Sequence, residues 1–197
     1  MIKERSGFTL IELLVVMAVV LVIGTIVVGI LFSSLRGSNK ASSLDNVRRN
    51  GNYAIEQIGK MIKYAQSFDG VSADTNPASY KTSCFTQIPS SPTPSPAPVN
   101  YKYIKVTSFD GGQTIFSCIN DTEIASLSAK TGISSKLVDT STVRISSCSI
   151  LCQQESIVSP PKITIGFKLT NVPPGGSSLS ENQASVFFQT SITTRNY

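Results

Sequence analysis

The sequence contains no histidine and no tryptophan, and only 15% of its 197 residues are charged. Without histidine, no Ser–His or Cys–His nucleophile pair can form, and the commonest metal ligand is missing. The net charge of +5 is modest and lacks the dense lysine and arginine stripe of a dedicated nucleic-acid-binding protein. No glycine-rich phosphate loop and no acid–base constellation is present. These shortages argue against an enzyme, and we expect no cofactor.

One long apolar segment, residues 8–32, dominates the N-terminal part of the chain, and only Thr9, Glu12 and Thr25 in it are clearly polar. As a helix it would be roughly 37 Å long, enough to cross a hydrocarbon core of about 30 Å. Lys3 and Arg5 precede it, which favours a cytoplasmic start. The sequence therefore predicts a single-pass membrane helix, with the following residues on the extracytoplasmic side.

Two simpler interpretations of this segment leave features unexplained. A secretory signal peptide has a shorter apolar core and a small-residue cleavage site after it, which this sequence lacks. An ordinary membrane anchor accounts for the length but not for Glu12, because a carboxylate in a membrane segment costs up to about 2.5–3.5 kcal/mol. Glu12 therefore predicts a functional role and a positively charged partner.

Residues 7–15 read GFTLIELLV and follow a short basic leader. This segment resembles the processing motif of type IV prepilins and type II secretion pseudopilins. The resemblance implies that a prepilin peptidase removes leader residues 1–7 by cutting between Gly7 and Phe8, and methylates the new amine of Phe8. It also implies that Glu12 pairs with the N-terminal amine of a neighbouring subunit and so sets the register of assembly. Loss of either partner would leave a costly unpaired charge.

Residues 33–68 form a predicted amphipathic stalk helix that ends at residues 68–70. Its apolar residues recur at spacings of three and four: Leu44, Val47, Ala54, Ile55, Ile58, Met61, Ile62 and Ala65. Four glycines are expected to weaken the helix locally: Gly24, Gly29, Gly37 and Gly51. Residues 69–197 are a predicted globular β domain with a proline-rich loop at 89–98 that favours extended polyproline conformation. The predicted fold class is thus α+β, with the long N-terminal helix packed on a C-terminal antiparallel sheet.

The β domain is predicted to hold one sheet of four or five strands. Residues 101–109 and 114–119 flank a hairpin signal at residues 110–113. Asp121 or Thr122 is expected to cap a short helix that runs through Ala129. Further strands are predicted at residues 142–150, 162–170 and 184–194. In the second of these, Ile163, Ile165, Phe167 and Leu169 alternate with more polar residues, which indicates one buried face.

The four cysteines are Cys84, Cys118, Cys148 and Cys152, and an exported protein would join them in disulfides. Three pairings are possible, and Cys84–Cys118 with Cys148–Cys152 is favoured. The second pair requires a turn at residues 149–151, because a straight strand would hold these residues about 13 Å apart. A zinc site at the four cysteines and a calcium site at Asp110 or residues 120–123 are the alternatives. We expect no metal, since the spacings fit neither site well.

The predicted function is structural: a minor pilin or pseudopilin of a type IV pilus-like or type II secretion filament. Its size and the pattern of its stalk resemble the larger minor pilins of the W type and the pseudopilins of the J type. Expected partners are the prepilin peptidase, other subunits and the inner membrane, before the chain joins a filament at the cell surface. The alternative is a binding module at the filament tip, for a surface or for DNA, suggested by the mild basicity and the proline-rich loop. That loop is also open to partner binding or glycosylation.

Overall fold

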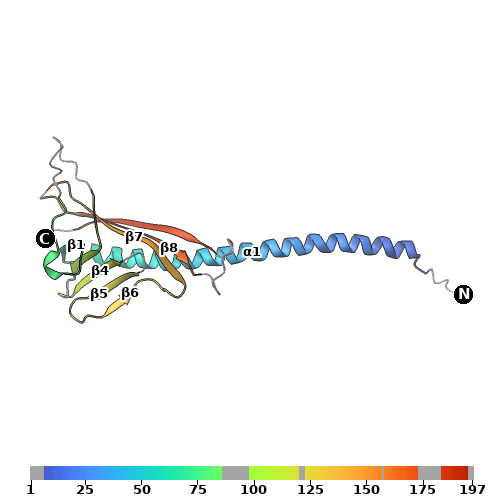
Figure 1. Ribbon diagram of the computed structural model, residues 1–197, viewed down its shortest axis with the longest axis horizontal. Helices are drawn as coiled ribbons and strands as arrows, with labels where there is room; N and C mark the ends of the chain where they lie inside the picture. The colour runs from blue at the N-terminus through green and yellow to red at the C-terminus, as the bar shows by residue number, and fades with distance from the viewer. Residues whose placement is uncertain (1–6, 86–97, 120–122, 157, 173–182, 195–197) are drawn as a thin grey trace.

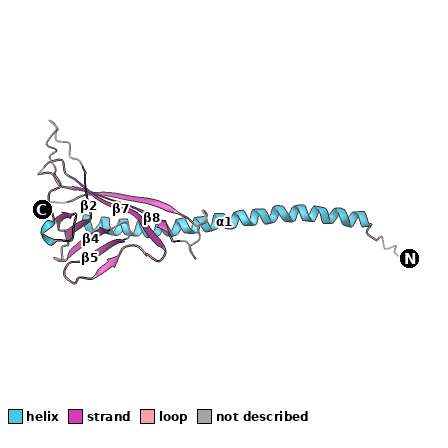
Figure 2. Ribbon diagram, in the orientation of Figure 1, coloured by secondary structure: helices cyan, strands magenta, loops and turns pink. Residues whose placement is uncertain are grey.

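The computed structural model describes residues 7–85, 98–119, 123–156, 158–172 and 183–194. A long helix and antiparallel strands make up this part of the chain, which confirms the predicted α+β class (Figures 1 and 2). The helix projects far beyond the strands, which gather around its C-terminal part (Figure 1). The elements are α1 Leu10–Lys63, β1 Ser67–Ser72, a 3-10 turn at Pro77–Ser79, β2 Val99–Tyr101, β3 Tyr103–Thr107, β4 Gln113–Ile119, β5 Glu123–Ser128, β6 Ser134–Lys136, β7 Val143–Gln153, β8 Lys162–Asn171 and β9 Ser185–Thr193.

Helix α1 is continuous over 54 residues, which corresponds to roughly 80 Å. No proline interrupts it, and Gly24, Gly29 and Gly37 lie within it without ending it. Lys60 and Lys63 occupy the last turn, where cations interact favourably with the helix dipole. The helix ends at Lys63, before the predicted end at Phe68, because residues 67–72 form β1 and pair with β3.

The strands form two sheets, so the prediction of a single sheet was wrong. One has five strands in the order β1-β3-β4-β5-β6, and the other has four in the order β2-β7-β8-β9. The predicted strand 101–109 is divided between them: Tyr101 pairs with Ile150 in the second sheet, whereas Tyr103 pairs with Ser117 in the first. Both parts alternate in the same way, so the local pattern could not reveal that the chain changes sheets at Lys102.

The predicted helix through Ala129 was also wrong, because residues 123–128 form β5. This strand pairs with β4 and buries Ile124 and Ala125. The expected caps, Asp121 and Thr122, lie outside the described residues. The β3–β4 hairpin is confirmed, and Gly111 has the positive φ of +75° that its turn requires. The strands predicted near 142–150, 162–170 and 184–194 are confirmed as β7, β8 and β9.

One hydrophobic core joins α1 to both sheets, and one face of the helix packs mainly on the four-stranded sheet. The buried stripe of the helix consists of Val47, Gly51, Ala54, Ile58 and Ile62. It faces the buried side chains of β8, which are Ile163, Ile165, Phe167 and Leu169, as the alternation predicted. Phe188 of β9 stacks on Phe167 with ring centroids 5.6 Å apart and also covers Gly51. An added Cβ at Gly51 would lie 2.2 Å from this ring. The helix can pack this closely on Phe188 because residue 51 has no side chain.

Candidate functional site

The first turn of α1 holds a capping box. The amide of Glu12 donates to Thr9 Oγ1 at 3.3 Å. In return, Glu12 Oε2 accepts from the amide of Thr9 at 3.3 Å and from its hydroxyl at 3.2 Å. The box satisfies two of the backbone donors that a helix start leaves free. It also folds the carboxylate of Glu12 back toward the peptide unit that follows Phe8.

The apolar surface of α1 is open around its whole circumference up to Leu35. Phe8 is 82% exposed, Val20 61% and Leu35 60%, and no other described part of the chain covers them. The helix is long and apolar enough to cross a membrane. An apolar surface of this size is not stable in water, so it has to lie in lipid or against other helices.

The structure places the predicted processing and assembly residues together at this end. Gly7 and Phe8 lie just before the helix and are exposed, and Glu12 follows within the first turn. Their proximity follows from the sequence spacing, because residues 8 and 12 are separated by about one helical turn. Cleavage after Gly7 would create a free amine on Phe8. This amine lies one residue before Thr9, whose amide already donates to Glu12.

The disulfides are Cys84–Cys152 and Cys118–Cys148, so the favoured pairing was wrong. The Cα atoms are 5.7 Å apart in the first pair and 5.8 Å apart in the second. Cys148 and Cys152 both lie on β7, which continues without a turn from Val143 to Gln153 and therefore holds them apart. Each of the four sulfurs is bonded to its partner in one of the two disulfides, which removes all four as zinc ligands. The described residues contain no cluster of three or more His, Cys, Asp or Glu side chains.

Both disulfides end on β7 and tie different parts of the chain to it. Cys118 belongs to β4, so its bond joins the five-stranded sheet to the four-stranded sheet. Cys84 is bonded to Cys152, which also pairs with Val99 of β2. Residues 84 and 99, which lie on either side of the proline-rich loop 89–98, are thus held at the same point of β7. Most of that segment lies outside the described residues.

The sequence analysis missed a second contact between α1 and the sheets. Asn50 Oδ1 accepts a hydrogen bond of 3.0 Å from the amide of Asp139, in the loop before β7. Hydrogen bonds from the side chain and amide of Ser141, and from Thr142, lower the pKa of the Asp139 carboxyl. An aspartate two residues before a serine is a signal for such a turn. Its partner on the helix could not be read from the sequence.

Residues 2–32 match the family model of the prokaryotic N-terminal methylation motif. This motif is typical of type IV pilins and pseudopilins, and a long helix packed on antiparallel sheets is consistent with the pilin fold. The chain therefore resembles pilins in its N-terminal motif and in its layout. The motif implies processing by a prepilin peptidase and assembly with other pilin subunits, and proteins of this kind are structural. No curated protein and no solved structure matches the chain.

Proposed function

We propose that the chain is a minor pilin or pseudopilin, a structural subunit of a type IV pilus-like or type II secretion filament. The prepilin peptidase cuts it between Gly7 and Phe8. The observation that carries the proposal is the carboxylate of Glu12, held at the start of an apolar helix and directed toward the residue that becomes the N-terminus.

The charges at this end explain why assembly would need Glu12. In a low-dielectric environment, a lone carboxylate or ammonium is expensive, and a close pair offsets much of the cost. The amide and the hydroxyl of Thr9 already donate to the carboxylate, yet neither group carries a positive charge. The methylated amine of Phe8, on the same or a neighbouring subunit, supplies that charge. Pairing between subunits then fixes their relative positions along the filament axis. During assembly, each apolar helix exchanges its contacts with lipid for contacts with other helices.

The remaining features support an extracytoplasmic location for the sheets. Two disulfides bind the globular part, and such bonds persist in oxidising compartments. Lys3 and Arg5 precede the apolar segment, as expected for a cytoplasmic leader. The subunit would wait in the inner membrane as a single-pass protein and then enter the filament.

Mass spectrometry of the N-terminus tests this proposal in cells that contain a prepilin peptidase. The expected mature chain begins at methylated Phe8, and a Gly7→Leu variant should accumulate as the uncut precursor. A mature chain that retains Met1, or one cut well beyond Phe8, would refute the assignment. Fractionation should find the mature chain among sheared filaments as well as in the membrane.

A second candidate function, binding of DNA by the displayed subunit, is favoured by one charge pattern. The four-stranded sheet carries Arg144, Lys162 and Lys168 and no acidic residue. Arg144 pairs with Thr170, and residues 162, 168 and 170 share one face of β8, so the three cations lie on the face opposite the buried residues. That face points away from α1 and therefore stays open when helices pack around one another.

Binding of the full chain in nanodiscs to duplex DNA, measured at several salt concentrations, tests this second function. Each phosphate contact should contribute a slope of about −0.9 in the plot of log affinity against log salt. Replacing Lys162 and Lys168 with serine should reduce that slope by about 2 if both bind phosphate. Absence of binding at low salt would exclude the function, and unchanged binding by the double variant would exclude this face.

A further inference from the structure

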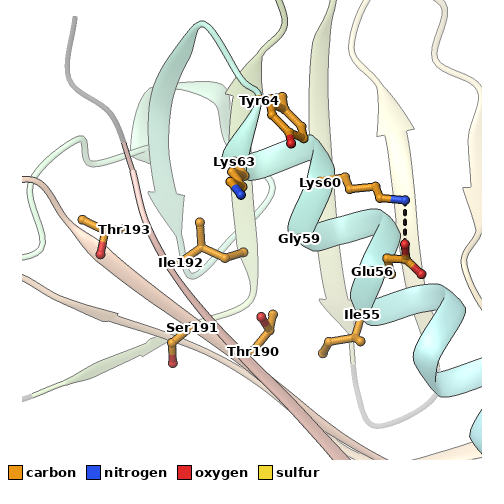
Figure 3. Close-up of a pocket in the computed structure, with 10 residues that line it drawn as sticks. All are labelled: Ile55, Glu56, Gly59, Lys60, Lys63, Tyr64, Thr190, Ser191, Ile192 and Thr193. Atoms are coloured by element: carbon orange, nitrogen blue, oxygen red, sulfur yellow. Dashed lines mark ion pairs between the residues drawn. The ribbon is translucent and has the colours of Figure 1, made fainter.

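An open groove runs between the C-terminal part of α1 and strand β9 (Figure 3). Its volume is about 690 Å³. On the helix side it is lined by Ile55, Glu56, Gly59, Lys60, Lys63 and Tyr64, and on the strand side by Thr190, Ser191, Ile192 and Thr193. Glu56 and Lys60 form an ion pair of 2.6 Å at its rim. The groove lies at the far end of the helix from the methylation motif and has no part in the proposed function.

Strand β9 is the edge of the four-stranded sheet, and the pairing shows which of its backbone groups bond to β8 and which do not. The amide of Thr194 donates to the carbonyl of Pro161, and that of Asn171 donates to the carbonyl of Ala184. Between these two bonds β8 and β9 pair without a register shift. Hydrogen-bonded positions alternate in an antiparallel pair, so the even-numbered residues of β9 bond to β8. The odd-numbered residues, including Ser191 and Thr193, direct their amides and carbonyls to the open edge.

Among the described strands, β9 is the sheet edge with the least protection against pairing. It has nine residues, no charge, no proline and no bulge. By contrast, β2 and β6 have three residues each, and β1 contains a register shift and is covered by a bridge between Val71 and Lys81. Long, uncharged edge strands readily accept another strand unless something blocks them. The groove beside Thr190–Thr193 is where such a strand would lie.

The helix side of the groove provides a floor for the side chains of an added strand. Ile55, Gly59 and Lys63 are spaced by four residues and so share one face of α1, next to the buried stripe. Gly59 has no atom within 4 Å of the position its Cβ would take, so it leaves open space in the wall of the groove. The stretch from Ile55 to Lys63 spans about 12 Å of helix. Four residues of β9 extend over roughly the same length, so the two walls match.

The positive charge of Lys63 favours an acidic ligand in the groove. Lys63 lies 5.6 Å from the ring of Tyr64 and forms no ion pair with any residue the structure describes. In Figure 3 its side chain lies beside the end of β9 that holds Ile192 and Thr193. A carboxylate on the added strand at this end would gain a charge-assisted contact.

We propose that the groove binds an extended acidic segment of another polypeptide, which adds to β9 as an antiparallel strand. Its backbone pairs with the free groups of Ser191 and Thr193, small apolar side chains rest on Ile55 and Gly59, and a carboxylate near its N-terminal end meets Lys63. Recognition therefore combines main-chain hydrogen bonds with pockets for alternate side chains.

A second copy of β9 does not fit this site. Gly51 contacts Phe188, and further along both elements the groove is lined by residues 55–64 and 190–193, so α1 and β9 run in the same direction. Antiparallel pairing of two β9 strands would set their α1 helices antiparallel. Two copies anchored in one membrane with the same topology cannot adopt that arrangement.

The test uses the full chain in nanodiscs and a labelled, N-acetylated eight-residue peptide. The peptide begins with two aspartates and continues with alternating valine and threonine. A second peptide of the same sequence is N-methylated on the amides that would face β9. We expect the first peptide to bind with saturation and the methylated peptide to bind at least tenfold more weakly. Equal binding of the two peptides, or no binding of either, would overturn the proposal.

Two pairs of variants locate the site. At Gly59 an added Cβ meets no atom within 4 Å, so Gly59→Leu puts a side chain into the groove and should weaken binding at least tenfold. Gly37→Leu, where a Cβ is equally unobstructed on the same helix, should leave binding unchanged. Lys63→Glu should weaken binding several-fold, while Lys40→Glu should not. Equal effects within either pair would show that the groove is not the binding site. Cross-linking of two chains through residue 191 would instead identify a second copy as the occupant and contradict the proposal.

Discussion

The two parts of α1 are one continuous helix with opposite surroundings. From Phe8 to Leu35 its apolar side chains are exposed on every side, and no described residue packs on them. From Val47 to Ile62 a single stripe is buried against the four-stranded sheet, and the other faces carry mostly polar and charged residues, with Tyr53 and Met61 as exposed exceptions. The first part has a pattern suited to lipid or a bundle of helices, and the second a pattern suited to one sheet and water.

This difference separates two kinds of stability. The C-terminal part is held by contacts within the chain, so changes there should alter unfolding of the globular part. The N-terminal part has no such contacts, so changes there should alter assembly and leave unfolding unchanged. The following predictions test that separation, beginning with the largest expected effect.

Glu12→Gln should leave membrane insertion, cleavage after Gly7 and the unfolding midpoint of the globular part unchanged. Incorporation into filaments should fall at least tenfold, because the ammonium of a neighbouring subunit would be left without a counter-charge. Quantitative blotting of sheared filaments and membranes measures this. Thr25→Val, a change of similar size within the same apolar segment, serves as the control and should assemble normally. Normal assembly of the glutamine variant would contradict the role of Glu12.

Replacing both cysteines of one disulfide with serine should destabilise only the globular part. The sequence separations are 68 for Cys84–Cys152 and 30 for Cys118–Cys148. The chain-entropy relation gives a loss of about 3.5–4.5 kcal/mol for either bond, somewhat more for the longer separation. Denaturant unfolding of the full chain in detergent, with and without reductant, measures it. Peptide mapping under non-reducing conditions checks the pairing, and a Cys148–Cys152 peptide would contradict this connectivity.

Gly51→Ala should destabilise packing of the helix on the sheet by about 1–3 kcal/mol, because the new Cβ would overlap the ring of Phe188. Gly37→Ala is the matched control: it lies on the same helix with open space around it and should be neutral or stabilising by up to about 1 kcal/mol. Thermal unfolding of both variants, followed by circular dichroism, makes the comparison. Equal midpoints would show that the packing at Gly51 relaxes without cost.

Asp139→Asn should have the smallest effect and should depend on pH. The folded-state pKa of Asp139 lies below its ordinary value of 3.8, so its carboxylate contributes stability that is complete above about pH 5 and is lost as pH falls below 4. The wild-type chain should therefore be slightly more stable than the variant at pH 6, and the difference should shrink as the pH falls below 4. Unfolding midpoints across this range measure it. A difference that grows on acidification would have the wrong sign.

The N-terminal helix could be predicted because its signals are local. Residues 7–15 contain the motif and the acidic residue within about two helical turns, and the apolar run needs no knowledge of tertiary contacts. Strands β7, β8 and β9 were also found, since their alternation is long and regular. The position of Glu12 relative to Phe8 followed from helix geometry alone.

The rest depends on contacts between distant residues. Tyr101 and Tyr103 belong to different sheets, and nothing in the alternation of residues 101–109 marks the change. The disulfide pairing required knowing that Cys148 and Cys152 lie on one uninterrupted strand. Gly37 and Gly51 look alike in the sequence, yet only Gly51 meets an aromatic ring. The free edge of β9 became visible only when the order of the strands was known.

The common direction of α1 and β9 determines how the subunit would respond to tension. A pull applied to the membrane end of α1, with the sheet held by neighbours, loads the helix–sheet interface in shear. In shear, the contacts from Val47 to Ile62 have to break at the same time. In a peeling geometry they would break one after another. A fibre built from such subunits would therefore resist extension with the whole length of this interface at once, and its weakest link under load would lie between subunits.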